Sequence, residues 1–226
     1  MKLNEMQVSP ETQEKLEQYL HLMLEANKVM NLTAVTDWDE ALVRHLTDSL
    51  MGASLLPEGA KVADVGTGAG LPGLPLAIAR PDCSFVLADT LKKRVDFLSE
   101  TVKTLGLTNV ATLWIRAEDM GRDPKYREQF DVAVCRALAA LRLSLEYLHP
   151  MVKVGGFSLF WKGSSVAEEI EAADKALREL KGAEPILHPY TLPGQQAQFA
   201  LVQVKKTQPT PKKYPRRVGV PAKNPL

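Results

Sequence analysis

The stretch KVADVGTGAGLPG, from Lys61 to Gly73, decides the fold of this chain. Its short apolar beginning, residues 61–65, predicts a buried strand. Gly66, Gly68 and Gly70 then follow at alternate positions, and glycine lets a backbone turn tightly and approach a ligand closely. The segment therefore predicts a strand that leads into a cofactor-binding turn and a helix.

Two classes of cofactor use such a turn. The dinucleotide pattern G-x-G-x-x-G also matches here, but if it started at Gly66, where the strand ends, it would need glycine in place of Leu71. A pyrophosphate gains nothing from a carboxylate, whereas S-adenosylmethionine carries a sulfonium and an ammonium whose charge Asp64 can offset, directly or through water. The segment favours S-adenosylmethionine, and a tight turn without a ligand is the plain structural alternative.

Composition indicates a soluble enzyme with one main domain. The chain has 226 residues, of which 45% are hydrophobic, and it contains no apolar run of membrane-spanning length. The amino terminus lacks the features of a secretory signal, so we expect a cytoplasmic protein without a membrane partner. The cysteines Cys83 and Cys135 and four scattered histidines provide neither a disulfide framework nor a metal site.

The net charge of +1 conceals a basic C-terminal segment. Residues 205–226 contain seven basic side chains, no acidic ones and five prolines, whereas the other residues carry 21 basic and 27 acidic side chains. Proline disfavours helix and sheet, so we expect an extended arm suited to phosphate contacts; a solubilising terminus is the alternative. The candidate phosphate ligands are Lys212, Lys213, Arg216 and Arg217.

Strand-like and helix-like segments alternate along most of the chain. This alternation predicts the α/β class, with a doubly wound, mostly parallel, seven-stranded sheet of the Rossmann-like type found in S-adenosylmethionine-dependent methyltransferases. The last strand can pair antiparallel with the one before it. The expected strands span residues 61–65, 84–88, 110–115, 130–135, 156–161, 185–190 and 198–204, and the expected helices span 72–80, 91–105, 137–148 and 166–181.

A helical extension precedes the sheet, so we divide the chain into an extension (1–57), a cofactor-binding domain (58–204) and a basic arm (205–226). Helix-start patterns lie at residues 9–11 and 37–40; the first helix breaks near Asn27 and the second continues to Leu55. In the second helix, three polar residues lie within about one turn of one another and either line the site or form a structural network. They are Arg44, His45 and Asp48.

The ends of the predicted strands carry further polar candidates. In parallel sheets the ligand lies beyond the carboxyl ends of the strands. There Asp89 can accept both ribose hydroxyls, while the amide of Ala117 and the carboxylate of Glu118 can meet adenine. Arg136 and Lys162 follow the next two strands. Each has a plainer alternative, such as a helix cap for Asp89 or a solvated surface position for the others.

At this point the chain resembles a known family, the bacterial guanine-N7 methyltransferases of small-subunit (16S) ribosomal RNA, often called RsmG or GidB. The resemblance spans nearly the whole chain. Its motifs are NLT (31–33), VRHLTDSL (43–50), DVGTGAGLPGLPL (64–76), ADTLKKRVDFL (88–98), RAED (116–119), CRAL (135–138), WKG (161–163) and the basic tail. Where the family usually has serine or alanine, this chain has Cys135. By the resemblance, the cofactor-binding positions are Gly66, Leu71, Ala117, Glu118 and Arg136.

The resemblance implies methyl transfer from S-adenosylmethionine to guanine N7 of 16S ribosomal RNA, without a metal. N7 carries a lone pair and no proton, so its attack needs no general base and positioning should dominate. We expect Arg136 to act as the catalytic residue that shapes the cofactor pocket and the guanine entrance. Arg44, His45 and Lys162 would contact RNA. A monomer that does not bind DNA is the default expectation.

Three rival functions stay open from the sequence. Cytosine-C5 methyltransferases use a cysteine nucleophile near the position of Cys135, although no neighbour obviously lowers its pKa. A nicotinamide-dependent oxidoreductase would share the glycine turn. A non-catalytic RNA-binding or assembly factor would share the fold.

Overall fold

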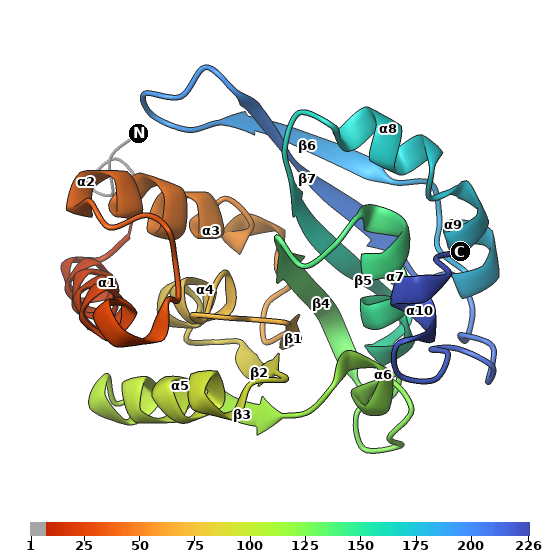
Figure 1. Cartoon of the computed structure of the whole chain (residues 1–226), viewed down its shortest axis with the longest axis horizontal. Coiled ribbons are helices and arrows are strands. Elements are labelled where there is room, and N and C mark those ends of the chain that lie inside the picture. The colour runs from red at the N-terminus through yellow and green to blue at the C-terminus, as the bar shows by residue number, and fades with distance from the viewer. Residues whose placement is uncertain (1–7) are drawn as a thin grey trace.

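The computed structural model describes residues 8–226 and is built around one seven-stranded sheet (Figure 1). The strand order is β3-β2-β1-β4-β5-β7-β6; β7 runs antiparallel to β5 and β6, and the other pairs are parallel. This confirms the predicted mostly parallel sheet with an antiparallel final strand. The strands are β1 (Lys61–Val65), β2 (Ser84–Asp89), β3 (Val110–Trp114), β4 (Phe130–Arg136), β5 (Val152–Lys162), β6 (Ile186–Thr191) and β7 (Gln198–Lys205).

Residues 1–7, which include the start of the expected extension and the segment judged to lack a secretory signal, lie outside the described residues. In the described part, no helix is both long and apolar enough to cross a membrane. The helices are α1 (Pro10–Met30), α2 (Trp38–Ala41), α3 (Asp48–Leu50), α4 (Gly73–Ala79), α5 (Lys92–Thr104), α6 (Ala117–Met120), α7 (Leu141–Leu148), α8 (Val166–Glu171), α9 (Asp174–Leu180) and α10 (Val220–Lys223).

Helices cover both faces of the sheet, so the fold has three layers (Figure 1). Because side chains alternate along a strand, the apolar residues of β1 serve both layers. Val62 belongs to a buried cluster with α1, α4 and α5, whereas Ala63 and Val65 belong to a second cluster with α7 and α9. The strand order reverses between β1 and β4, which is where open parallel sheets bind ligands.

The first helix packs into the same core as the sheet and touches the glycine turn. Leu16, Leu20 and Tyr19 are fully buried, and Ser9 caps the helix as its sequence predicts. The Tyr19 hydroxyl donates to the carbonyl of Ala69 at 2.9 Å. The extension therefore supports the turn directly. The helix continues to Met30, beyond the expected break.

The second helical segment differs from the single helix expected over residues 41–55. Asp37 caps its start, as predicted, by accepting from the Glu40 amide at 2.9 Å. Its middle, Leu42–Thr47, is a π-helix, and Ala53–Leu55 form a 3-10 turn. Hydrophobic periodicity does not distinguish these helix types, because each still places one stripe on the core.

Two other helices differ in their limits. The expected helix over residues 137–148 begins only at Leu141, since Ala137 adopts a left-handed φ of 53°. The segment expected as one helix over residues 166–181 is split into α8 and α9. The first of these differences lies at the carboxyl edge of the sheet, directly after β4.

The C-terminal tail packs against the body of the protein, which corrects the expected extended arm. Lys205 still belongs to β7, and Lys206 is fully buried, with its Nζ donating to Glu128 at 2.8 Å. Arg216 donates to the buried Glu146, and residues 220–223 form α10 beside α7. Charge composition misses this arrangement because the partners of these cations are carboxylates and backbone carbonyls elsewhere in the chain.

The buried partner of Arg216 yields the first prediction. The Glu146 side chain is 1% exposed, so Arg216→Met leaves this buried carboxylate without its cation, although the backbone amide of residue 216 still donates to it. We expect the free energy of unfolding to fall by about 3 kcal/mol in chemical denaturation at neutral pH. The control is Arg217→Met at the exposed neighbouring position, which should unfold like the wild type. Equal stability of the two variants would contradict the conclusion that the tail contributes to the stability of the fold through Arg216.

Candidate active site

Two cavities lie side by side at the carboxyl edge of the sheet. The first, of about 410 Å³, is here called the glycine-loop cavity, and its lining includes Gly66, Asp89 and Glu118. The second, of about 510 Å³, is called the Arg136 cavity. Ala137 lines both cavities. Its left-handed backbone is unusual for a residue with a side chain, and such conformations cluster at functional sites.

Asp64 lies fully buried at the end of β1, beneath the glycine turn. Its Oδ2 accepts from the Thr67 hydroxyl at 2.6 Å and from the Gly73 amide at 2.8 Å. Among the described residues, its Oδ1 has no partner. Burial raises the pKa of Asp64 to about 7, although the hydrogen bonds from Thr67 and Gly73 oppose that rise. An unpartnered buried carboxylate oxygen fits a cationic ligand group.

The glycine turn needs its glycines for two separate reasons. Gly66 has a φ of +69°, and a Cβ there would lie 2.5 Å from the side chain of Leu138. At Gly73 a Cβ would overlap Leu87 and the Asp64 carboxylate. The turn therefore comes close to both the cavity wall and the buried acid. Within it, the amides of Gly70 and Leu71 donate to the Thr67 carbonyl, at 2.9 and 3.0 Å.

Asp89 links the glycine turn to the start of α5. Its Oδ2 accepts from the Gly68 amide at 3.0 Å, and its Oδ1 accepts from the Leu91 amide at 2.9 Å. Arg94 lies 3.4 Å from Oδ2. The N-cap of α5 is Leu91, so Asp89 does not cap the helix and instead forms a turn ahead of it, and its carboxylate lines the glycine-loop cavity.

Ala117 and Glu118 form the first turn of α6 and line the same cavity. Glu118 is 6% exposed, and its Oε1 accepts from the Gly219 amide at 3.0 Å. The structure thus brings Gly66, Asp89, Ala117 and Glu118 together around one cavity, whereas Asp64 is fully buried under the glycine turn and is not among the lining residues. Gly68, Gly70 and Leu71 belong to the supporting turn and are not among the residues that line the cavity.

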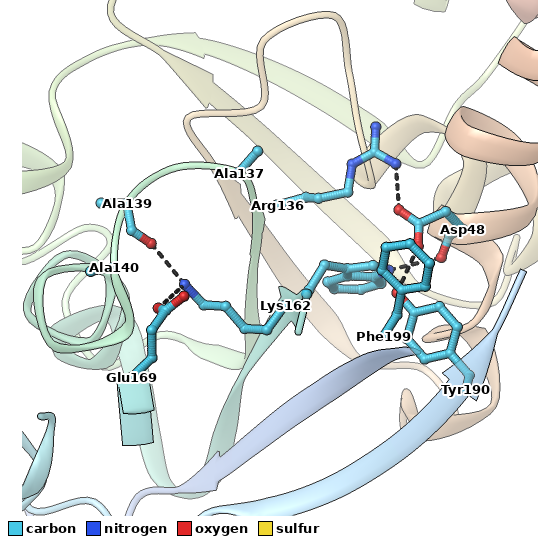
Figure 2. A pocket seen from close by; sticks show the side chains of 11 residues that line it. Asp48, Arg136, Ala137, Ala139, Ala140, Lys162, Glu169, Tyr190 and Phe199 are labelled. Atoms are coloured by element: carbon cyan, nitrogen blue, oxygen red, sulfur yellow. Dashed lines mark hydrogen bonds and ion pairs between the residues drawn. The ribbon is translucent and has the colours of Figure 1, made fainter. Parts of the chain in front are cut away.

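Arg136 lies at the end of β4 and lines the second cavity (Figure 2). Its Nη1 donates to Asp48 Oδ2 at 2.7 Å and to the Arg44 carbonyl at 2.8 Å. That carbonyl lies within the π-helix Leu42–Thr47, which explains how a helical residue offers its carbonyl to a strand. The irregular helix therefore positions this guanidinium.

Asp48 is the centre of a polar network that sequence analysis only partly anticipated. Its Oδ1 accepts from the Tyr190 hydroxyl at 2.6 Å, and its carbonyl accepts from Trp161 Nε1 at 2.8 Å. Tyr190 and Phe199 stack with ring centroids 5.7 Å apart, and both line the Arg136 cavity (Figure 2). These aromatic residues were missed. Their only sequence signal is their place on two adjacent predicted strands.

His45 is a buried neighbour of Arg136 in this network. It is 7% exposed, its Nε2 lies 2.9 Å from the Thr33 hydroxyl, and its Nδ1 lies 3.5 Å from Arg136 Nη2. Burial and then the Arg136 cation lower the pKa of His45 to about 4. The imidazole is therefore neutral at pH 7. This environment matches the structural alternative, and contact of His45 with RNA stays a prediction.

The other predicted cations differ in whether a carboxylate already pairs with them. Lys162 lines the Arg136 cavity but donates to Glu169 at 2.7 Å and to the Ala139 carbonyl at 2.8 Å (Figure 2). Arg44 pairs with Glu40 at 2.8 Å on the surface. In the tail, Lys213 pairs with Glu179 and Arg216 with Glu146. Within residues 8–226, no ion-pair partner is found for two exposed cations, Lys212 and Arg217.

Cys135 is buried, with 2% of its surface exposed. Burial raises the pKa of its thiol to about 12, whereas a nucleophilic cysteine needs a low pKa. The structure thus favours a buried structural cysteine over a nucleophile. In the part of the chain that the structure describes, no group of three or more His, Cys, Asp or Glu side chains is arranged to hold a metal ion.

The strand order and the helices on both faces give the chain a Rossmann-like fold, which solved structures of methyltransferases share. A predicted O-methyltransferase from Agrobacterium tumefaciens shares the fold, with a TM-score of 0.56 and 19% identity over 72% of this chain and 82% of that one. M. jannaschii TYW2, solved in complex with AdoMet, has a TM-score of 0.55 and 15% identity over 71% of this chain and 74% of that one.

Sequence comparison gives the particular family. The family model described as rRNA small subunit methyltransferase G (GidB) matches residues 12–191. A protein named ribosomal RNA small subunit methyltransferase G from Moorella thermoacetica is 45% identical over 97% of this chain and 92% of its own length. One of the same name from Trichormus variabilis is 38% identical over 95% and 90%. The chain belongs to this family, as its sequence motifs predicted.

Proposed function

We propose that this protein transfers a methyl group from S-adenosylmethionine to N7 of a guanine in 16S ribosomal RNA of the small subunit. The observation that carries the proposal is the unpartnered Oδ1 of buried Asp64 beneath a glycine turn, beside a cavity that Ala137 joins to a second one. The relatives' shared name supplies the class of substrate. A ribosomal substrate implies a cytoplasmic enzyme, and we propose a monomer that does not act on DNA.

The residues around the glycine-loop cavity suit the parts of the cofactor. Asp89 can accept from ribose hydroxyls, Ala117 and Glu118 can meet adenine, and the Asp64 carboxylate can offset the methionine ammonium. When bound, the cofactor supplies an electrophilic methyl group on a sulfonium. The proposed chemistry needs no metal.

The Arg136 cavity suits the acceptor base. It offers the stacked rings of Tyr190 and Phe199, and Asp48 holds the Arg136 guanidinium in place. No residue there needs to remove a proton, because guanine N7 attacks through a free lone pair. Holding the base in line with the methyl group makes the displacement effectively unimolecular, which is worth up to about 7–11 kcal/mol.

The rival functions fit the site less well. A cytosine-C5 reaction requires a reactive thiolate, and Cys135 is buried with a raised pKa. A dinucleotide cofactor would place its pyrophosphate beside Asp64, where a carboxylate without a partner is unfavourable for an anion. A non-catalytic RNA-binding protein would have no need of two carboxylates, Asp89 and Glu118, at the wall of a cofactor-sized cavity.

The first test is methyl transfer from labelled S-adenosylmethionine to small ribosomal subunits that lack the modification, with the product nucleoside identified by mass spectrometry. We expect 7-methylguanosine from the wild type and from Cys135→Ser at similar rates. Arg136→Ala should lose at least about 100-fold in rate, because the base then lacks its positioned cation. Formation of 5-methylcytidine, or loss of transfer in Cys135→Ser alone, would instead support cysteine chemistry.

A second test uses the raised pKa of Asp64. Without ligand, the raised pKa means that Asp64 contributes to stability at low pH and loses that contribution as pH rises through about 7. A cationic ligand favours the ionised form, so cofactor affinity should increase from pH 5.5 to 7.5, by at most about tenfold per unit. Titration calorimetry in two buffers should detect proton release. Asp64→Asn should bind weakly and without this pH dependence; a wild-type affinity that stays constant would contradict the ammonium contact.

The exposed tail cations give a third test. We propose that Lys212 and Arg217 contact RNA phosphate, while Lys213 and Arg216 contribute less because carboxylates already neutralise them. The double variant Lys212→Ala/Arg217→Ala should lower the slope of log affinity against log salt by about 0.7–0.9 per lost contact. The control Lys103→Ala removes an exposed cation from α5, on the other face of the sheet, that has no ion-pair partner within residues 8–226. Equal slopes in both variants would make the tail cations solubilising.

A further inference from the structure

We propose that the last nine residues of the chain, 218–226, form the adenine-side wall of the cofactor site and orient Glu118 for adenine. This inference rests on the proposed function, because it assumes that the glycine-loop cavity takes S-adenosylmethionine. It assigns to the tail a role distinct from RNA binding. The positioning residue is Gly219, which acts through Glu118.

The tail contributes directly to the cavity. Gly219 and Ala222 line it together with Ala117 and Glu118. The Gly219 amide donates to Glu118 Oε1 at 3.0 Å, and this is the hydrogen bond that the structure gives to the Glu118 side chain among the described residues. Its other carboxylate oxygen is left to accept from a ligand. A backbone amide 101 residues away in the chain therefore holds a predicted adenine ligand in place.

The segment is anchored on both sides of this contact. Ahead of it, the Arg216 amide and guanidinium both donate to the buried Glu146, and Arg127 donates to the carbonyls of Thr210 and Tyr214. Behind it, Leu226 is 8% exposed within the cluster formed with α7 and α9. Gly219 itself has a φ of +79°, which favours glycine. Figure 1 shows α10 beside α7 and close to α6. The amide position is thus determined by packing.

The chemistry of the contact points to adenine in particular. Adenine carries an exocyclic amine that donates hydrogen bonds, and a carboxylate oxygen accepts them. Hypoxanthine has a carbonyl at that position, which a fixed carboxylate repels. With one Glu118 oxygen occupied by the Gly219 amide, the remaining oxygen is held for the amine. The tail should therefore contribute to discrimination between the two bases, and not only to general affinity.

The experiment compares the full chain with a chain that ends at Arg217, which keeps the Arg216 and Arg127 anchors. Titration calorimetry measures two ligands, S-adenosylhomocysteine and its analogue with hypoxanthine in place of adenine. We expect the truncation to weaken S-adenosylhomocysteine by about tenfold or more and to change the affinity of the analogue little. The preference for adenine should therefore collapse. The control Lys223→Ala, at an exposed position of α10, should behave like the full chain.

Two further variants keep the proposal falsifiable. If the truncated chain does not fold, Gly219→Ala displaces the same amide in a full-length chain, because alanine strains at this φ, and the same loss of preference is expected. Truncation combined with Glu118→Gln should cost less than the sum of the separate effects. Unchanged binding, or equal losses for both ligands, would overturn the orienting role. Failure of the full chain to bind S-adenosylhomocysteine would instead count against the proposed function.

Discussion

The buried carboxylate of Asp64 is the interaction on which the site depends. One of its oxygens ties the glycine turn to the end of β1 through Thr67 and Gly73, so the turn cannot relax away from the sheet. Its other oxygen has no partner among the described residues, and burial keeps its pKa near 7. Without a ligand this is an unfavourable arrangement, since an ionised oxygen in the core needs compensation. Scaffold and ligand preference therefore come from the same side chain, and a substitution that changed one would change the other.

The second cavity depends on the N-terminal extension. Asp48 and the Arg44 carbonyl come from the irregular helical segment, and both accept from Arg136 at the end of β4. Tyr190 joins from the antiparallel edge of the sheet. Three regions of the chain thus meet at the Asp48–Arg136 ion pair, with Tyr190 bound to Asp48. A Rossmann-like sheet alone would supply the arginine but not its orientation, which comes from the extension packed against the main core.

The sequence anticipated the parts of this site that a strand carries in its own pattern. Asp64 lies near the end of a predicted strand, Asp89 follows the next one directly and Glu118 comes three residues after the third. Parallel strands bring their carboxyl ends to one edge, so this convergence needs no tertiary information. The π-helix and the left-handed conformation of Ala137 were not predicted, because hydrophobic periodicity reports which side chains are buried and not the exact backbone path. Tyr190 and Phe199 were not predicted as site residues either, because a tyrosine that lines a cavity and a tyrosine in the core occupy the same kind of position in an apolar strand.

The C-terminal tail shows how one charge pattern can serve two purposes. Its composition alone indicates an exposed basic arm, and Lys212 and Arg217 are in fact exposed. The charge of Lys206, however, is buried and pairs with the partly exposed Glu128, and Arg216 pairs with the buried Glu146; both contacts cost desolvation and fix the path of the backbone. A defined path is what brings the Gly219 amide to Glu118. The basic residues of this tail therefore divide between holding the chain and facing outward, and the division follows from where the body of the protein offers a buried acid.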